Sequence, residues 1–370
     1  TLNNYGVRNS DWEDVSGGDG FYNQIDPTNS NIVYTESQGG NISRLDRSTG
    51  SATRIRPMAY STESDEDRSY DFNWNAPIVV SQHDPNTIYI GANHLLRSRD
   101  QGMTWEETSP DLTRLIDRDT LEVMGRPLSE SHLSRNDGIS SYGNITAISE
   151  SSFSPSVIYV GTDDGNLQVT RDGGASWMIV ENRPGLARGT YVSRLQASRH
   201  SEGRVYASFD AHNDDDYKPY LYVSEDYGMS WQSIVSNLPD WSINVVREHH
   251  LSPDLLFLGN EVGIYVSFDR GNNWQPLKGN FPTVPVDDIA IHPRENDLIV
   301  GTHGRSIWIL HDLGPLQEIA ENPRILDTAL QGFRSKPGVQ WIRSGGWPFW
   351  GDMFIAANPE DGIKIRYWLG

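Results

Sequence analysis

The chain has 370 residues and is acidic, with 50 Asp and Glu against 30 Lys and Arg and a formal net charge of −20. This charge argues against nucleic acid as a partner, because phosphates need a basic surface. It also argues against binding to anionic membranes through a polybasic segment. The absence of cysteine excludes disulfides, thiol catalysis and zinc sites built on cysteine. No apolar run approaches the roughly 20 residues that cross a bilayer, so no transmembrane segment is expected.

The 12 Trp, 16 Tyr and 34 Gly suit a β protein rich in turns. The length allows one large all-β domain or two smaller domains. The chain starts at Thr1 without a Met or a signal-like segment, so we interpret it as a processed chain or a fragment of a longer protein.

In chain order, the first strand-like segment is 12–16, which starts with Trp12 and has no neighbouring strands of its own. Six repeats of short apolar strands follow, and a spacing of tens of residues between them predicts a β-propeller of four-stranded blades. The repeats span residues 21–57, 74–110, 144–182, 191–237, 243–279 and 286–313. Two segments interrupt them, an acidic Ser-rich loop at 58–70 and an insertion of mixed charge at 111–142.

A turn with the pattern Ser/Thr-x-Asp-x-Gly-x-Ser/Thr-Trp occurs in four repeats, at 98–105, 170–177, 224–231 and 267–274. The last copy has Asn273 in place of the second Ser/Thr, and 46–50 is a degenerate copy. The aspartate can accept hydrogen bonds from the turn backbone, and the glycine supplies a backbone angle that is costly for other residues. We therefore predict structural roles for Asp100, Trp105, Asp172, Trp177, Asp226, Trp231, Asp269 and Trp274.

The sixth repeat has only three strands, and segment 12–16 looks like an outer strand without a repeat. Pairing the two would close the ring and remove exposed sheet edges. We favour six blades, and seven if residues precede Thr1. The predicted propeller covers residues 1–315, and 316–370 is a connector followed by a short β extension that starts a second β segment or contacts a partner.

The repeated turns resemble the Asp-box (BNR) repeats of sialidases, of sortilin/Vps10 propellers and of xyloglucanase-type glycoside hydrolases. Residues 161–165, 224–228, 285–293 and 301–310 resemble more narrowly a group of large secreted bacterial proteins with sortilin-like propellers. The resemblance covers residues 12–315. It implies a secreted, periplasmic or cell-surface bacterial protein, although one propeller fold hosts many functions.

In propellers of this kind the repeated turns lie on the face opposite the usual binding site. The resemblance therefore implies that the loops after each second strand, and the starts of the inner strands, ring the central channel. This predicted binding face contains Asn75, Asn93, Asn144, Asp163, Arg194, Asp210, Asn244, Glu261, His303 and Arg305.

Two functions are compatible with this ring. The first is a non-catalytic propeller that binds a protein or glycan, or that serves as a subunit of a larger assembly; we favour it because no complete catalytic set is evident. The alternative is a glycoside hydrolase acting on a polysaccharide, which needs a pair of carboxylates. The candidates for that pair are Asp287, Asp288, Glu261 and Asp163.

We expect no cofactor, with Ca²⁺ as the one possible exception. The insertion at 212–216 is rich in oxygen ligands, through Asp214, Asp215 and Asp216. Its spacing is not that of a regular calcium loop, and a solvated acidic loop is the simpler interpretation.

Overall fold

The computed structural model describes residues 7–8, 11–19, 21–58, 70–117, 120–123, 126–127, 142–181, 183–338, 355–356 and 362–370. Most of the segment at 58–70, much of the insertion at 111–142 and the Trp-rich stretch at 341–350 lie outside these residues.

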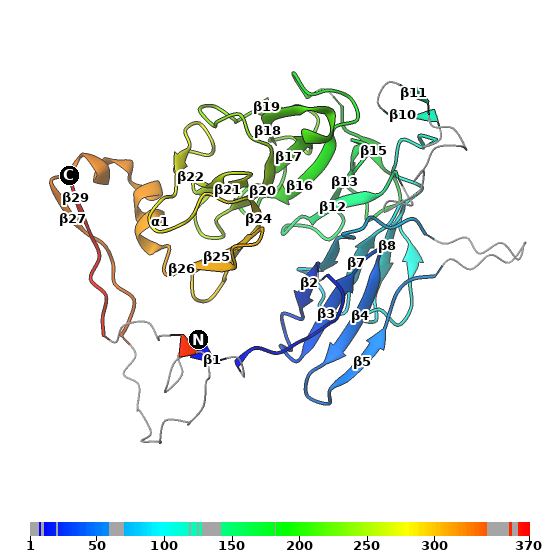
Figure 1. The fold of residues 1–370 in the computed structure, drawn as a ribbon, viewed down its shortest axis with the longest axis horizontal. Coiled ribbons are helices and arrows are strands. Elements are labelled where there is room, and N and C mark those ends of the chain that lie inside the picture. The colour runs from blue at the N-terminus through cyan, green and yellow to red at the C-terminus, as the bar shows by residue number, and fades with distance from the viewer. Residues whose placement is uncertain are drawn as a thin grey trace, which may run out of the picture.

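Six antiparallel sheets follow one another along the chain and are arranged around a centre (Figure 1), which confirms the predicted six-bladed β-propeller. The first two blades contain β2 (Asn23–Ile25), β3 (Ile32–Ser37), β4 (Asn41–Asp46) and β5 (Ser51–Arg54), then β6 (Ile78–Val80), β7 (Ile88–Gly91), β8 (Leu95–Ser98) and β9 (Glu106–Glu107). The third contains β12 (Ile145–Glu150), β13 (Ile158–Thr162), β14 (Leu167–Thr170) and β15 (Met178–Ile179).

The fourth blade contains β16 (Tyr191–Ala197), β17 (Val205–Ala211), β18 (Asp216–Ser224) and β19 (Gln232–Ser233), with a short 3-10 turn, η3 (His212–Asp214), before β18. The fifth contains β20 (Ile243–Glu248), β21 (Leu256–Asn260), β22 (Gly263–Ser267) and β23 (Gln275–Pro276). The sixth contains β24 (Val286–Ile291), β25 (Leu298–Thr302) and β26 (Ile307–Leu310). Within each blade, strands adjacent in sequence are adjacent in the sheet.

The second to fifth blades are covered by their neighbours on both faces, and this explains the continuous apolar runs of their second strands. All residues of β7, β13 and β21 are buried. A strand that is buried on both faces loses the apolar–polar alternation of a half-exposed strand. The core of the described residues therefore lies between consecutive blades, from the first and second to the fifth and sixth.

The repeated turns hold themselves together through their aspartates. In the fourth blade Asp226 accepts hydrogen bonds from the backbone N–H and the hydroxyl of Ser230, at 2.8 and 2.6 Å. Ser224 Oγ donates to the same carboxylate and accepts from the N–H of Gly228 at 2.7 Å. The turns at Asp100, Asp172 and Asp269 repeat this set, and the side-chain amide of Asn273 replaces the hydroxyl in the last one.

The tryptophan of each repeated turn contacts the preceding blade. The indole N–H groups donate to backbone carbonyls there: Trp105 to Ile55 at 2.8 Å, Trp177 to Thr108 at 3.1 Å and Trp274 to Ile234 at 2.8 Å. Trp231 is buried in the same way, but its Nε1 has no acceptor in the described part of the chain. The tryptophans therefore join neighbouring blades, in addition to starting their own outer strands.

Glycines that end the second strands allow the next blade to approach closely. A Cβ on Gly161 would lie 2.3 Å from Cγ1 of Val192, and one on Gly259 would lie 2.4 Å from Cγ1 of Val286. The equivalent Gly301 in the sixth blade has only the carbonyl of Asp288 near this position, at 3.6 Å. The outward face of the sixth blade is thus not packed like the others.

The predicted closure by the segment around Trp12 is wrong. The sixth sheet has three strands among the described residues, and the side chains of Ile307 and Ile309 on β26 are 57% and 51% exposed. Trp12 is 70% exposed, and Glu13 forms an ion pair with Arg47 in the turn of the first blade. A five-residue similarity to an outer strand does not encode a partner strand, and the ion pair between Glu13 and Arg47 places this segment beside the first blade.

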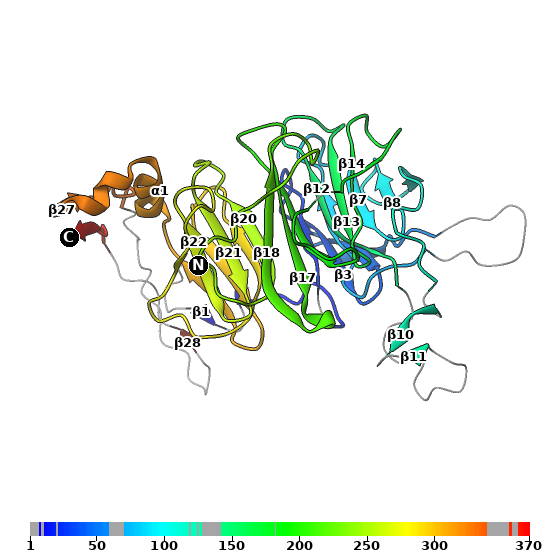
Figure 2. The ribbon, with the colours of Figure 1, turned by 90° about the horizontal axis from the view of Figure 1, so that it is seen from above.

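The chain after the sixth blade continues into a helix, α1 (Gly314–Glu321), and a 3-10 segment, η4 (Pro323–Asp327). Leu316 and Ala320 of α1 pack into the core shared by the fifth and sixth blades. Three two-stranded sheets complete the fold: β27 (Leu330–Gly332) with β29 (Tyr367–Leu369), β1 (Val7–Arg8) with β28 (Ile355–Ala356), and β10 (Glu122–Val123) with β11 (Arg126–Pro127). Figure 2 shows α1 and β27 at one end of the molecule and β10–β11 at the other.

We predict that Trp274→Phe destabilises the protein more than Trp231→Phe. The first substitution leaves the buried carbonyl of Ile234 without its donor, whereas Trp231 has no such bond to lose. An unpaired buried polar group costs about 1–3 kcal/mol. Denaturant unfolding of the two variants measures this difference, and equal losses would contradict the role of the indole bond between blades.

We also predict opposite outcomes for two matched glycine substitutions. Gly161→Ala forces a methyl group against Val192 and should cost about 1–3 kcal/mol, the usual range for overpacking. Gly301→Ala meets only ordinary contacts and should be neutral, or stabilising by about 0.5 kcal/mol through the unfolded state. Thermal unfolding compares the two, and a large loss from Gly301→Ala would show that another element packs on the sixth blade in solution.

Candidate functional site

One arginine connects three blades across the central channel. Arg194, on the inner strand β16, donates from Nη1 to the hydroxyl of Tyr22 in the first blade at 2.7 Å. Its Nη2 lies 3.3 Å from the carbonyl of Asp287 and 3.2 Å from Oδ1 of Asp288, both on β24. The side chain of Arg194 is only 12% exposed. The channel is therefore spanned by a charged side chain that is held on opposite sides.

Asp288 lies between two arginines. Arg247 Nη2 donates to the same Oδ1 that Arg194 contacts, at 2.9 Å, and Arg247 Nε donates to the carbonyl of Ile289. Burial opposes ionisation of Asp288, but the two guanidinium groups outweigh it and lower the pKa of this carboxyl. Burial and the neighbouring Arg194 lower the pKa of Arg247, although Asp288 opposes this. Asp288 is thus held in its ionised form.

Asp287 is adjacent in sequence but differs in its environment. Its side chain is 56% exposed, and its carboxylate lies 3.6 Å from Nδ1 of His303, which is 81% exposed. Partial burial raises the pKa of Asp287; His303 opposes this rise, and the carboxylates of Glu261 and Asp288 add to it. Asp287 therefore retains a proton to higher pH than an ordinary aspartate.

Other predicted ring residues form pairs within their own blades. Asp163 accepts hydrogen bonds from the backbone and side-chain amides of Asn144, at 2.7 and 3.1 Å, and from Gly143 at 3.0 Å. Burial raises the pKa of Asp163 to about 6 against these hydrogen bonds. Asn244 donates to Glu261 at 2.8 Å, which repeats the same arrangement in the fifth blade.

The remaining predicted residues form local hydrogen bonds or are exposed. Asn93 donates to Asp111 at 2.8 Å. Asp210 accepts hydrogen bonds from the backbone and ring of His212, at 3.0 and 2.5 Å. Asn75 and Arg305 are exposed, and only the carbonyl of Arg305 is engaged, by Trp308 Nε1 at 2.8 Å.

The residues predicted for this face did not include Tyr22, Tyr191 or Arg247. Tyr22 immediately precedes the inner strand of the first blade, the same kind of position that selected Asn144 and Asn244. Tyr191 starts β16, and burial raises its pKa, with smaller contributions from Tyr22 and Asp163. Their positions at the start of an inner strand could have identified Tyr22 and Tyr191, but the prediction considered only charged and amide side chains at such positions.

The calcium candidates do not form a cluster. Asp216 accepts hydrogen bonds from the backbone of Lys218 at 3.1 Å and from the hydroxyl of Tyr220 at 2.6 Å, and Asp214 and Asp215 are exposed. In the described ranges, no group of three or more His, Asp or Glu side chains is placed to hold a metal ion.

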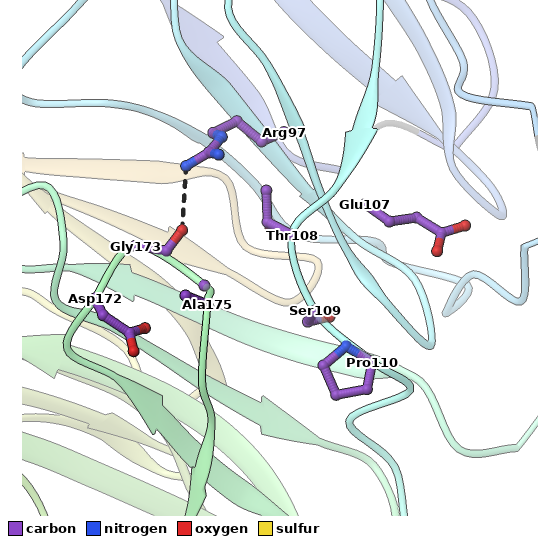
Figure 3. A pocket seen from close by; sticks show the side chains of 9 residues that line it. Arg97, Glu107, Thr108, Ser109, Pro110, Asp172, Gly173 and Ala175 are labelled. Atoms are coloured by element: carbon purple, nitrogen blue, oxygen red, sulfur yellow. Dashed lines mark hydrogen bonds between the residues drawn. The ribbon is translucent and has the colours of Figure 1, made fainter.

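A cavity of about 460 Å³ between the second and third blades lies apart from this ring (Figure 3). It is formed by the segment after β9 and by the repeated turn of the third blade, where Arg97 Nη1 donates to the carbonyl of Gly173 at 3.3 Å. None of the predicted ring residues lines it. Its lining serves the contact between the two blades.

Comparison with known proteins supports the fold. A family model described as "Sortilin, neurotensin receptor 3" (Sortilin-Vps10) matches residues 219–312, about a quarter of the chain. Xyloglucanase Xgh74A of Acetivibrio thermocellus is 26% identical over 253 residues, which are 60% of this chain and 27% of that protein. The oligoxyloglucan-reducing end-specific xyloglucanase of Emericella nidulans is 22% identical over 249 residues, 63% of this chain and 26% of that protein.

The crystal structure of the GH74 xyloglucanase from Xanthomonas campestris superposes with a TM-score of 0.51 at 19% identity, covering 80% of this chain and 52% of that one. The chain is therefore a six-bladed β-propeller similar to sortilin-type and xyloglucanase propellers. It spans only about a quarter of the length of the two curated xyloglucanases. No helix in the described part of the chain is long and apolar enough to cross a membrane.

We predict opposite effects of neighbouring Asp→Asn substitutions on stability. The pKa of Asp288 is lowered, so its stabilising contribution is present at neutral pH and is lost as the pH falls through the folded-state pKa. Asp288→Asn should therefore lower the melting temperature most at pH 7. The loss in the free energy of unfolding should be about 1 kcal/mol or less, because half of this side chain is exposed to screening solvent.

Asp287→Asn is the matched control. The raised pKa of Asp287 means that its ionised form is disfavoured in the folded state, so the amide should be neutral or stabilising at pH 7. Thermal unfolding between pH 3 and 8 measures both variants. Equal behaviour of the two would contradict the difference in environment.

Proposed function

We propose that the channel face of this propeller binds a polysaccharide and cleaves a glycosidic bond there. The observation that carries this proposal is Asp287, an accessible carboxyl whose pKa is raised in the vicinity of Glu261. Glycosidases use one carboxyl that keeps its proton and a second carboxylate that activates water or attacks the sugar. The similarity to two xyloglucanases supports this class of reaction.

The environments of the four candidate carboxyls suggest their roles. Asp287 suits the general acid, because it protonates more readily than an ordinary aspartate. Glu261 suits the second carboxylate, since it is only partly buried and Asn244 orients it by a hydrogen bond. Asp288 is neutralised by two arginines, and Asp163 is occupied by amide donors, so both suit structural roles.

A non-catalytic binding propeller is the second candidate function. It is favoured by the number of ring residues whose polar groups are already paired within the protein, among them Asp163, Asp210 and Asp288. Such a ring is rigid and can bind a glycan or a protein loop without chemistry of its own. In either case we propose a secreted, periplasmic or cell-surface location, where polysaccharides are accessible.

We predict that release of reducing ends from xyloglucan, or from another β-glucan, is lost in Asp287→Asn and in Glu261→Gln. Removal of a general acid or base costs typically about 10²–10⁴-fold in rate. Because the proton on Asp287 is required, activity should fall as the pH rises through its raised pKa. Asp214→Asn, the same change on an exposed loop, is the control and should be fully active.

The outcomes separate the two candidates. Hydrolysis that survives Asp287→Asn would reject the assigned acid. Binding of oligosaccharides without hydrolysis, measured by calorimetry, would favour the non-catalytic candidate, and absence of both would reject a glycan ligand at this face.

A further inference from the structure

A second cavity, which the channel site does not use, lies beside the third blade. It has a volume of about 250 Å³, and its lining includes three arginines, Arg114, Arg183 and Arg188, against one acid, Glu181. No carboxylate of the described residues forms an ion pair with any of these arginines. On a chain with a net charge of −20, this lining carries an excess of positive charge, with three guanidinium groups against one carboxylate. The cavity, called the arginine pocket below, has the charge of a site for an anionic group.

The arginines of this pocket are positioned by the fold. Arg183 donates to the carbonyls of Val180 at 2.7 Å and Gly165 at 3.2 Å, and its guanidinium lies 5.0 Å from the ring centre of Phe209. Burial lowers the pKa of Arg183, although Tyr222 and the carboxylate of Glu181 oppose this shift. Arg114 donates to the carbonyl of Asp164 at 3.3 Å. Arg188 is exposed and forms no hydrogen bond or ion pair with a described residue.

The other walls of the pocket are apolar. Leu167, Ile179, Val180 and Leu186 contribute to its lining. A planar guanidinium suits carboxylate, phosphate and sulfate oxygens, and apolar walls suit the C–H face of a sugar ring. The volume is smaller than the roughly 300–1,000 Å³ of sites for drug-sized molecules, so it suits one charged sugar unit.

The pocket adjoins the channel face. Its wall includes Gly165, which ends the same short turn after β13 that carries Asp163 of the ring. The segments that supply Arg114 and Arg183 lead into and out of the third blade at this end of its strands. A polysaccharide lying on the channel face would therefore pass close to the arginine pocket.

We propose that the arginine pocket binds the oxyanion of a charged sugar, a uronate carboxylate or a sulfate ester, and so selects acidic polysaccharides. The inference rests on the proposed function only in its choice of a glycan as ligand. It assigns a class of ligand that neither the channel residues nor the similarity to xyloglucanases indicates. The net negative charge of the chain makes unspecific attraction of polyanions weak, so binding depends on this pocket.

The test is calorimetric binding of three oligosaccharides of equal length to the whole chain: an oligogalacturonate, a sulfated oligosaccharide and a neutral xyloglucan fragment. The variants are Arg188→Gln and Arg114→Gln, since Arg183 also holds its own loop. Loss of one charge-assisted bond should weaken binding about tenfold. Arg171→Gln removes an equal charge from the repeated turn of the same blade, where Arg171 lies over Tyr227, and should have no effect.

Preference for the carboxylated or the sulfated probe identifies the source of the oxyanion, and either supports the proposal if Arg188→Gln and Arg114→Gln weaken it. Equal binding of the neutral fragment, no binding of either charged probe, or equal effects of Arg188→Gln and Arg171→Gln would overturn it. Tighter binding of an acidic peptide than of both charged probes would overturn the assignment to a glycan. The experiment measures binding and not hydrolysis, so a channel site without glycosidase activity would not change its outcome.

Discussion

The second to fifth blades of this propeller are sheets that are covered on both faces by their neighbours, and the rest of the structure depends on this packing. The cover comes from the neighbouring blades, which approach so closely at Gly161 and Gly259 that a methyl group does not fit. Hydrogen bonds from indole N–H groups to backbone carbonyls of the preceding blade add specific polar contacts to this apolar packing. Because burial is shared between blades, no single repeat has a core of its own. Each blade is therefore stabilised by its contacts with neighbouring blades, and the arrangement of the blades around a centre forms the channel.

The channel is where the ring places charge. Arg194 bonds to the first and the sixth blades, which are far apart in sequence, and Arg247 adds a second cation beside Asp288. The two arginines pair with the carboxylate of Asp288, whereas Asp287 beside it has a raised pKa. The pKa values of two neighbouring aspartates are thus shifted in opposite directions, because one faces the arginines and the other does not. Such a pair of environments is the physical basis for assigning an acid at this face.

Particular residues show how far the sequence could predict the site. The repeated turns were predictable because Asp226 and its partners lie within seven residues, so their hydrogen bonds are local. Asn144 and Glu261 were predicted for the ring from strand order and the family resemblance, and each forms a hydrogen bond within its own blade. The partnership of Arg194 with Tyr22 did not, because these residues are separated by 172 positions and meet only across the channel. The predicted pairing of the segment around Trp12 was wrong for the same reason, since an outer-strand motif does not specify the sheet that it joins.

The sequence by itself determined the fold class and the geometry of the repeated turns and favoured six blades over seven, since all of these depend on short-range periodicity and on hydrogen bonds within a few residues. Only the tertiary structure decided which carboxyl has a raised pKa, which face of the sixth blade remains exposed, and where three arginines gather around one cavity. These properties depend on distances between blades, and the repeat pattern contains no information about those distances.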